Sequence, residues 1–283
     1  MKEIEVIRRL LPYMAAAGGD LLIGAGEDDA AVWRQPDGTF VVATCDTSVE
    51  GVHFDLGRQR AEAVGWRALC FELGDLAAKG AAPTFGLVSL SMPRRWPFEV
   101  AVGIYKGLSG LADEVGLRLA GGDTTVAPND GSLTLMLLGA ARVRPLARSA
   151  AQPGWRVGVT GRLGGASLAW ERPRPRLRLG AELAAAGLCC GDISDGLLME
   201  MDKFAAAAGV GALLHLDAVP VADGARPEQA VASGEEVELV CCGPELPPGL
   251  HPIGEVTAGP RVVLLDAQGR ELEVRKRGYD HFA

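Results

Sequence analysis

Short apolar runs alternate with longer helical patterns along the whole chain. Runs with the residue types and alternation of β-strands occur at 39–44, 85–92, 117–120, 132–143 and 155–161. Between them, apolar residues recur at helical spacing over 61–79 and 97–115, and Pro97 suits the first turn of a helix. This order of elements predicts an α/β fold.

A change of composition at 142–155, toward Arg, Pro and Ala, predicts a domain boundary. We therefore expect an N-terminal domain over 1–141 and a C-terminal domain over 142–283, and the length of 283 residues suffices for both. The second half repeats the α/β pattern. It has predicted helices at 176–187 and 195–209, predicted strands at 188–194, 211–219 and 235–242, and a predicted hairpin at 261–274.

Charge and cysteine usage exclude several classes of protein. The net charge of −8 argues against nucleic acid as the main partner, because a phosphate backbone requires a basic face. No apolar run is long enough to span a bilayer, and the charged residues among the first eleven argue against a signal peptide. The six cysteines form no C-x-x-C pair, which argues against a zinc site or a redox dithiol. We expect a cytoplasmic protein with reduced thiols.

Aspartates beside Gly, Ser or Thr recur at the ends of predicted elements. Each alone suits a turn or a helix N-cap. Asp75 differs, because it lies inside an apolar helical pattern, where a charge is costly unless it is paired or binds a metal. Carboxylate and hydroxyl oxygens without His or Cys clusters are ligands for hard cations such as Mg²⁺. The members of this set are Asp28, Asp29, Asp46, Asp75, Asp123, Asp192 and Asp195.

Several Mg²⁺ ions would most often serve a polyphosphate, whose oxygens complete their coordination. The chain has no G-x-x-x-x-G-K-[ST] motif, so it is not a P-loop enzyme. None of its few lysines lies in a glycine-rich loop. Metal ions and an arginine, with Arg148 the best placed, would therefore have to neutralise a bound nucleoside triphosphate.

Eight stretches, taken in order, resemble the thiamine-monophosphate kinases, which belong to the superfamily of aminoimidazole ribonucleotide synthetase. The resemblance covers nearly the whole chain. It implies a two-domain PurM-like fold, a homodimer formed through the N-terminal sheets, and transfer of phosphate from ATP to thiamine phosphate with Mg²⁺. The stretches are GAGEDDAAV, TCDTSVEGVHF, RALCFELGDLAAKGAAP, LAGGDTT, GDISDGLL, SGEEVEL, IGEVTAG and GYDHF.

The resemblance also implies a role for each matching residue. Metal ligands would be Asp29, Thr44, Cys45, Asp46, Asp75, Asp123, Asp192 and Asp195. ATP contacts would be Tyr105, Gly122, Asp123, Arg148 and Ser194, and thiamine phosphate contacts would be His53, Glu235 and Tyr279. No covalent or general-base residue is required, because the acceptor is an ionised phosphate and catalysis would depend on alignment and charge neutralisation.

The sequence departs from the family pattern at several positions. Glu27 looks inserted, which leaves open whether Asp28 or Asp29 is the ligand, and the thiol of Cys45 is a poor ligand for Mg²⁺. The other departures are Glu72, Gly74, Lys79 and Val237, together with a shortened stretch between Gly161 and Asp192.

The predicted strand that begins at residue 39 is expected to end at Ala43 and to present Thr44 and Asp46 to the triphosphate. A turn at Glu50 and Gly51 would then direct His53 to the acceptor. Two alternatives remain. One is another ATP-using enzyme of the superfamily, such as a selenophosphate or ribonucleotide-amidine synthetase. The other is a non-catalytic protein that binds ATP or thiamine phosphate.

Overall fold

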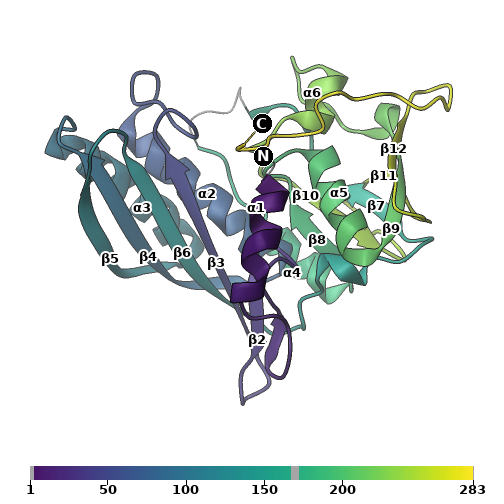
Figure 1. Ribbon diagram of the computed structural model, residues 1–283, viewed down its shortest axis with the longest axis horizontal. Coiled ribbons are helices and arrows are strands. Elements are labelled where there is room, and N and C mark those ends of the chain that lie inside the picture. The colour runs from purple at the N-terminus through teal and green to yellow at the C-terminus, as the bar shows by residue number, and fades with distance from the viewer. Residues whose placement is uncertain (1–2, 167–171, 283) are drawn as a thin grey trace.

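The structure, a computed structural model, describes residues 3–166 and 172–282, which form two mixed sheets lying side by side (Figure 1). The first sheet has the order β1-β2-β3-β6-β4-β5, and only the β4/β5 pair is parallel. Its strands are β1 (Leu21–Ile23), β2 (Ala31–Arg34), β3 (Phe40–Val49), β4 (Ala82–Pro93), β5 (Arg118–Ala127) and β6 (Ser132–Ala141).

Two long helices, α2 (Ala61–Ala78) and α3 (Phe98–Val115), cover one face of this sheet. They confirm the helices predicted at 61–79 and 97–115. Helix α3 also explains the parallel pair, because β4 and β5 run in the same direction only if a crossover connection joins them. Leu133, Leu135 and Leu137 alternate along β6 and are fully buried against the helices, so the core lies on this face.

Two strands run further than the sequence predicts. The end predicted for β3 at Ala43 is wrong, because residues Thr44 to Val49 continue to pair with β6. These residues are polar because one face of the sheet is open; there the Thr47 and Thr134 hydroxyls lie 2.8 Å apart across the two strands. The strand predicted at 117–120 likewise extends to Ala127 as β5.

The second sheet has the order β12-β9-β11-β7-β10-β8. Its strands are β7 (Arg156–Val159), β8 (Cys189–Asp192), β9 (Val210–His215), β10 (Leu239–Gly243), β11 (His251–Ala258) and β12 (Val262–Leu265). The helices of this half are α4 (Leu177–Ala185), α5 (Leu197–Ala208) and α6 (Pro227–Ala232). The sequence prediction missed β11 and α6. The predicted hairpin at 261–274 forms in part: after β12 the chain turns back, an antiparallel bridge joins Leu265 to Glu271, and the Leu272 N–H donates to the Leu264 carbonyl at 2.8 Å.

The two halves meet where α4 packs on the end of α2. A Cβ atom on Gly180 would lie 2.0 Å from the carbonyl oxygen of Ala77, so only glycine permits this close approach. The N-terminal helix α1 (Glu3–Leu10) meets the C-terminal tail, where the backbone N–H of Glu3 lies 3.4 Å from Asp280 Oδ1. The first sheet ends at Ala141 and the second begins with β7; the domain limits near residue 142 stay a prediction.

In the part of the chain that the structure describes, no helix combines the length and apolar character needed to cross a bilayer.

Candidate active site

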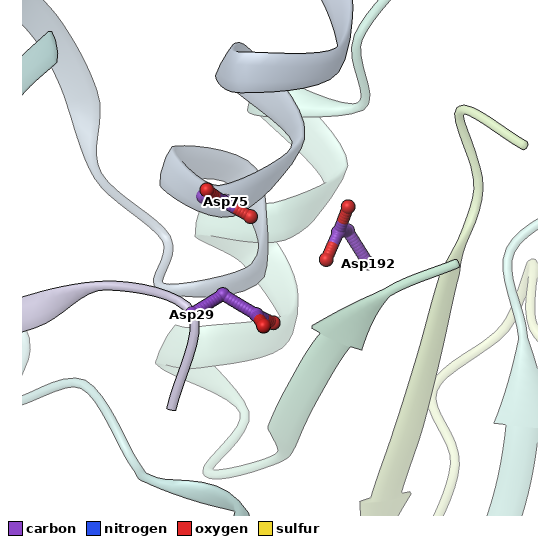
Figure 2. Close-up of side chains that lie close together, drawn as sticks. All are labelled: Asp29, Asp75 and Asp192. Carbon is purple, nitrogen blue, oxygen red and sulfur yellow. The ribbon is translucent and has the colours of Figure 1, made fainter. Parts of the chain in front are cut away.

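Three aspartates from separate elements converge where the two halves of the molecule meet. Asp29 lies on the loop before β2, Asp75 on α2 and Asp192 at the end of β8 (Figure 2). One carboxylate oxygen from each lies within 4.8 Å of those of the other two. We call Asp29, Asp75 and Asp192 the acid cluster. The structure thus brings together three of the residues that the sequence analysis assigns to the metal site, and their role as ligands stays a prediction.

The electrostatics of the acid cluster fit a bound cation. Burial, followed by the charges of neighbouring acids, raises the pKa of Asp75 and the pKa of Asp192 well above the ordinary value. One oxygen of Asp192, Oδ1, is buried without a hydrogen-bond partner among the described residues. Buried acids with raised pKa and an unsatisfied oxygen are costly alone and become favourable ligands when a divalent cation is present. The donor set, all oxygen, suits Mg²⁺.

Strand β3 contributes Thr44 and Asp46 on the side of the acid cluster. The Thr44 hydroxyl donates a hydrogen bond to Asp75 Oδ2, which joins β3 to α2. Side chains alternate along a strand, so Cys45 points to the opposite, exposed face. Its side chain therefore does not share the face of Thr44 and Asp46.

Asp46 lies at the open side of the acid cluster. Lost solvation, followed by the charges of Asp29 and Asp195, raises the pKa of Asp46. Next to it lies Glu72, an acid that the sequence analysis records as a departure and not as a site residue. Glu72 is 1% exposed, and burial raises its pKa well above the ordinary value. The site thus holds one more buried acid than the family pattern implies.

The structure separates the roles of Asp28 and Asp29. The Asp28 side chain is fully buried; its Oδ1 lies 2.7 Å from Lys79 Nζ, and its Oδ2 accepts the backbone N–H of Arg148 at 3.0 Å. Asp29 lies beside Asp75 and Asp192 in the acid cluster and is bound by the Arg148 guanidinium. Burial would raise the pKa of Asp29, but the cations around it lower the pKa to about 2. These contacts favour Asp29 as the ligand.

Arg148 is 4% exposed, so it is not the surface residue that its place near a linker suggests. Besides Asp29, its Nε binds Glu200 Oε1 at 2.5 Å. Lys203, one turn beyond Glu200 on α5, binds Asp195 Oδ2 at 2.8 Å. The sequence analysis missed Glu200 and Lys203 as site residues. Their spacing of three residues places both on one face of a helix, but it does not show which residues that face contacts.

The segment Ser194–Asp195 connects the acid cluster to the residues expected to bind thiamine phosphate. The backbone N–H of Glu235 donates to the Ser194 carbonyl at 2.6 Å, and that of Tyr279 donates to the Asp195 carbonyl at 2.9 Å. The Glu235 side chain is held by Arg67, whose Nη2 lies 2.8 Å from Glu235 Oε2. Glu235 and Tyr279, from two distant parts of the sequence, therefore both contact this short segment.

His53 lies near the C-terminal tail. Its ring centroid is 5.1 Å from that of His281, which meets the ring of Tyr279 edge-on at 4.8 Å. The Nδ1 atom of His53 accepts the backbone N–H of Val49 at 3.0 Å, and burial followed by the charge of His281 lowers the pKa of His53. His281 was missed at the sequence level, although it lies in the GYDHF stretch.

Three residues expected to contact ATP or metal do not join the acid cluster. Tyr105 lines a pocket of about 490 Å³ together with Phe98 and Thr124. Gly122 and Asp123 lie in β5, three strands away from β3, which is about 14 Å at the usual strand spacing. Asp123 is exposed, and its side chain makes no hydrogen bond or ion pair within the described ranges.

Comparisons with known proteins identify the family of the chain. Residues 27–143 match the family model "AIR synthase related protein, N-terminal domain". A thiamine-monophosphate kinase of Methanopyrus kandleri is 34% identical, covering 84% of this chain and 84% of the relative. One of Rhodopirellula baltica is 33% identical, covering 83% of this chain and 78% of the relative.

Among solved structures, AaThiL complexed with AMPPCP and TMP shares the fold with a TM-score of 0.84 at 24% identity, over 99% of this chain and 97% of that chain. This likeness confirms the PurM-like α/β fold. The sequence identity to the curated relatives establishes more than the fold. The chain belongs to the thiamine-monophosphate kinase family.

Proposed function

We propose that this protein transfers the γ-phosphoryl group of ATP directly to thiamine phosphate, giving thiamine diphosphate and ADP. The observation that carries the proposal is the segment Ser194–Asp195, which lies between the acid cluster and the backbones of Glu235 and Tyr279. The proposed donor and acceptor sites would thus be adjacent. The family relatives are named for this activity, and the AaThiL structure contains AMPPCP and TMP.

Asp29, Asp75 and Asp192 would hold Mg²⁺, with Asp46 and Asp195 at the open side of the same acids. The bound ions would neutralise the charge of the triphosphate and of the group being transferred. The protein itself contributes alignment. Thr44 fixes Asp75 by a hydrogen bond, and Arg148 fixes Asp29, so the ligands are held before any substrate arrives.

On the acceptor side, His53 is a positioning donor. Because its Nδ1 accepts the Val49 N–H and its pKa is lowered, the neutral ring carries its proton on Nε2. That N–H is free to donate to a phosphate oxygen of the acceptor. Tyr279, 40% exposed, presents an aromatic ring, which attracts a permanent cation such as the thiazolium of thiamine. The acceptor phosphate is already ionised, so no general base is needed.

We further propose a homodimer, which would also account for the distant position of Asp123. Strand β2 pairs with β3 only from Phe40 to Ala43, so the second half of β3 has no neighbouring strand on that side among the described residues. Strand β5 is the exposed edge at the other end of the sheet. Two copies related by a two-fold axis could pair β5 of one with β3 of the other, closing both open edges.

The open face of the sheet supports this assembly, since it carries Phe85 and Leu87 at 39% and 40% exposure. In such a dimer the Asp123 of one copy would lie beside Asp46 of the other. Mixing inactive Asp46→Asn with inactive Asp123→Asn protein should then restore about a quarter of the wild-type rate after random exchange of subunits. No recovery would show that each chain completes its own site.

The release of ADP with and without thiamine phosphate tests the function. We expect release that requires thiamine phosphate, with thiamine as a negative control that lacks the acceptor phosphate. Release that ignores thiamine phosphate would favour another ATP-using enzyme of the superfamily, and binding without release would favour a non-catalytic role. A cytoplasmic location is part of the proposal, and the six free thiols suit a reducing compartment.

A further inference from the structure

Lys203 directs its ammonium group at the acids of the site from α5. Its Nζ lies 2.8 Å from Asp195 Oδ2 and 3.4 Å from Glu200 Oε2. Side chains on a helix lean toward its N-terminus, so Lys203 reaches back over Glu200 to the segment that precedes the helix. That segment holds Ser194 and Asp195, which lie between the expected donor and acceptor sites.

Three cations pair with acids at or next to the acid cluster in the described part of the chain, and they differ in accessibility. The Lys79 side chain is 0% exposed and the Arg148 side chain 5%, whereas the Lys203 side chain is 32% exposed. Lys79 is held by Asp28 and by the carbonyl of Cys190. Lys203 is therefore the cation of the three that an incoming anion can reach.

Arg148 has little capacity left for a ligand. Its guanidinium and backbone N–H already bind Asp28, Asp29 and Glu200. Releasing any of these partners would leave a buried carboxylate without its cation, which is strongly unfavourable. Lys203, in contrast, contacts Asp195 at a partly exposed position, where another oxygen can replace this partner.

The charge balance of the site also calls for such a residue. The positive charge of Lys203 lowers the pKa of Asp29, of Asp46 and of Asp192. A cation bound by those acids would take over the neutralisation that Lys203 provides in its absence. The ammonium would then be free to meet the phosphates of a nucleotide at the same place.

We propose that Lys203 is a phosphate-contacting residue of the donor site, where its ammonium donates a hydrogen bond to a β- or γ-phosphoryl oxygen of the nucleoside triphosphate. The inference rests on the proposed function. It assigns to Lys203 the direct phosphate contact that the family resemblance implies for Arg148. The role of Arg148 becomes that of holding Asp29, Asp28 and Glu200 in place.

Calorimetric titration with AMPPCP and with AMP, both in excess Mg²⁺, tests the proposal. In Lys203→Met, AMPPCP should bind about tenfold or more weakly, the usual cost of a lost charge-assisted hydrogen bond. AMP lacks the β- and γ-phosphates, so its affinity should stay within about twofold. Lys203→Arg keeps the charge and should recover most of the AMPPCP affinity. Lys276→Met, at an exposed lysine in the tail, is the matched control and should match the wild type.

A thermal melt of each variant checks the fold, and Lys203→Gln replaces the methionine variant if the latter does not fold. Unchanged AMPPCP affinity in Lys203→Met would overturn the proposal. If this variant also bound one additional Mn²⁺ ion per chain, Lys203 would only occupy a cation position. An equal loss of AMP and AMPPCP affinity would overturn it as well. Failure of wild-type protein to bind AMPPCP would contradict the proposed function itself, so the two failures are distinguishable.

Discussion

Lys79 and Asp28 form an ion pair whose side chains are both completely buried, with Nζ 2.7 Å from Oδ1. Lys79 also donates to the carbonyl of Cys190 at 2.9 Å, so the side chain of the residue that caps the C-terminus of α2 binds the loop before β2 and strand β8 of the other half. These three segments carry the acid cluster. The pair thereby fixes the positions from which Asp29, Asp75 and Asp192 converge.

Lys79→Met should be strongly destabilising. The substitution leaves the Asp28 carboxylate buried without its ammonium partner, and breaking a buried pair in this way costs about 3–5 kcal/mol. Lys79→Met combined with Asp28→Asn should be more stable than Lys79→Met alone, because no unpaired charge remains. The free energy of unfolding in urea measures both effects.

An exposed pair provides the matched control for this prediction. Arg178 and Glu182 lie one helical turn apart on α4, with side chains 94% and 56% exposed. Arg178→Met should cost less than about 1 kcal/mol, as is usual for surface ion pairs. If Lys79→Met cost no more than Arg178→Met, the buried pair would have no role in joining the two halves.

Asp75 should oppose stability when no metal is bound. Burial and the neighbouring acids raise its pKa in the folded state, so the folded protein binds the proton more tightly than the unfolded chain. The metal-free protein should then lose stability as pH rises above the unfolded value. Asp75→Asn keeps a hydrogen-bond acceptor for Thr44. The free energy of unfolding of this variant should fall less with rising pH than that of the wild type, and the variant should be inactive. Urea unfolding between about pH 5 and pH 8 would test it; a steeper loss in the variant would contradict it.

Asp46→Asn should abolish phosphoryl transfer and leave the fold intact. Asp46 lies at the open side of the acid cluster, where the developing charge of the reaction must be neutralised. A loss of about 100-fold or more in kcat is expected for one electrostatic contact of this kind. Asp223→Asn, at an aspartate whose side chain is 98% exposed, is the control. Near wild-type turnover of Asp46→Asn at saturating Mg²⁺ would remove Asp46 from the metal site.

Much of this site could be predicted from the sequence because its residues follow local rules. Asp75 stands out as a charge within an apolar helix, and the structure places it in the acid cluster. Helices α2 and α3 follow from apolar spacing alone. The predicted end of β3 at Ala43 was wrong because polar residues such as Thr47 can continue a strand that has one open face. In the sequence this polar pattern resembles a loop.

Other parts of the site depend on contacts between distant segments, which no local pattern records. The choice between Asp28 and Asp29 required the position of Lys79, fifty-one residues beyond Asp28 along the chain. The burial of Arg148 could not be read from a segment with the composition of a linker. Likewise, Lys203 looks like an ordinary exposed lysine on α5 until Asp195 is seen beside it.

Tyr279→Ala should weaken binding of the acceptor and not of the nucleotide. Loss of the ring that faces the thiazolium should raise the KM for thiamine phosphate several-fold, in line with about 0.5–2 kcal/mol for a cation–π contact. The KM for ATP should be nearly unchanged. Tyr13→Ala, at a tyrosine that is 88% exposed, is the control. A lowered melting temperature, or an equal rise in the KM for both substrates, would mean that Tyr279 only anchors the tail.

Phosphorus NMR of one reaction mixture is the most direct test of phosphoryl transfer from ATP to thiamine phosphate. With protein, ATP, Mg²⁺ and thiamine phosphate present, the γ-phosphate signal of ATP should disappear as the signals of thiamine diphosphate and ADP grow in equal amounts. A chelator should stop the reaction, and Asp192→Asn, which removes one acid of the cluster, should prevent it. Conversion of the γ-phosphate to inorganic phosphate without thiamine diphosphate, or unchanged transfer in Asp192→Asn, would contradict the account.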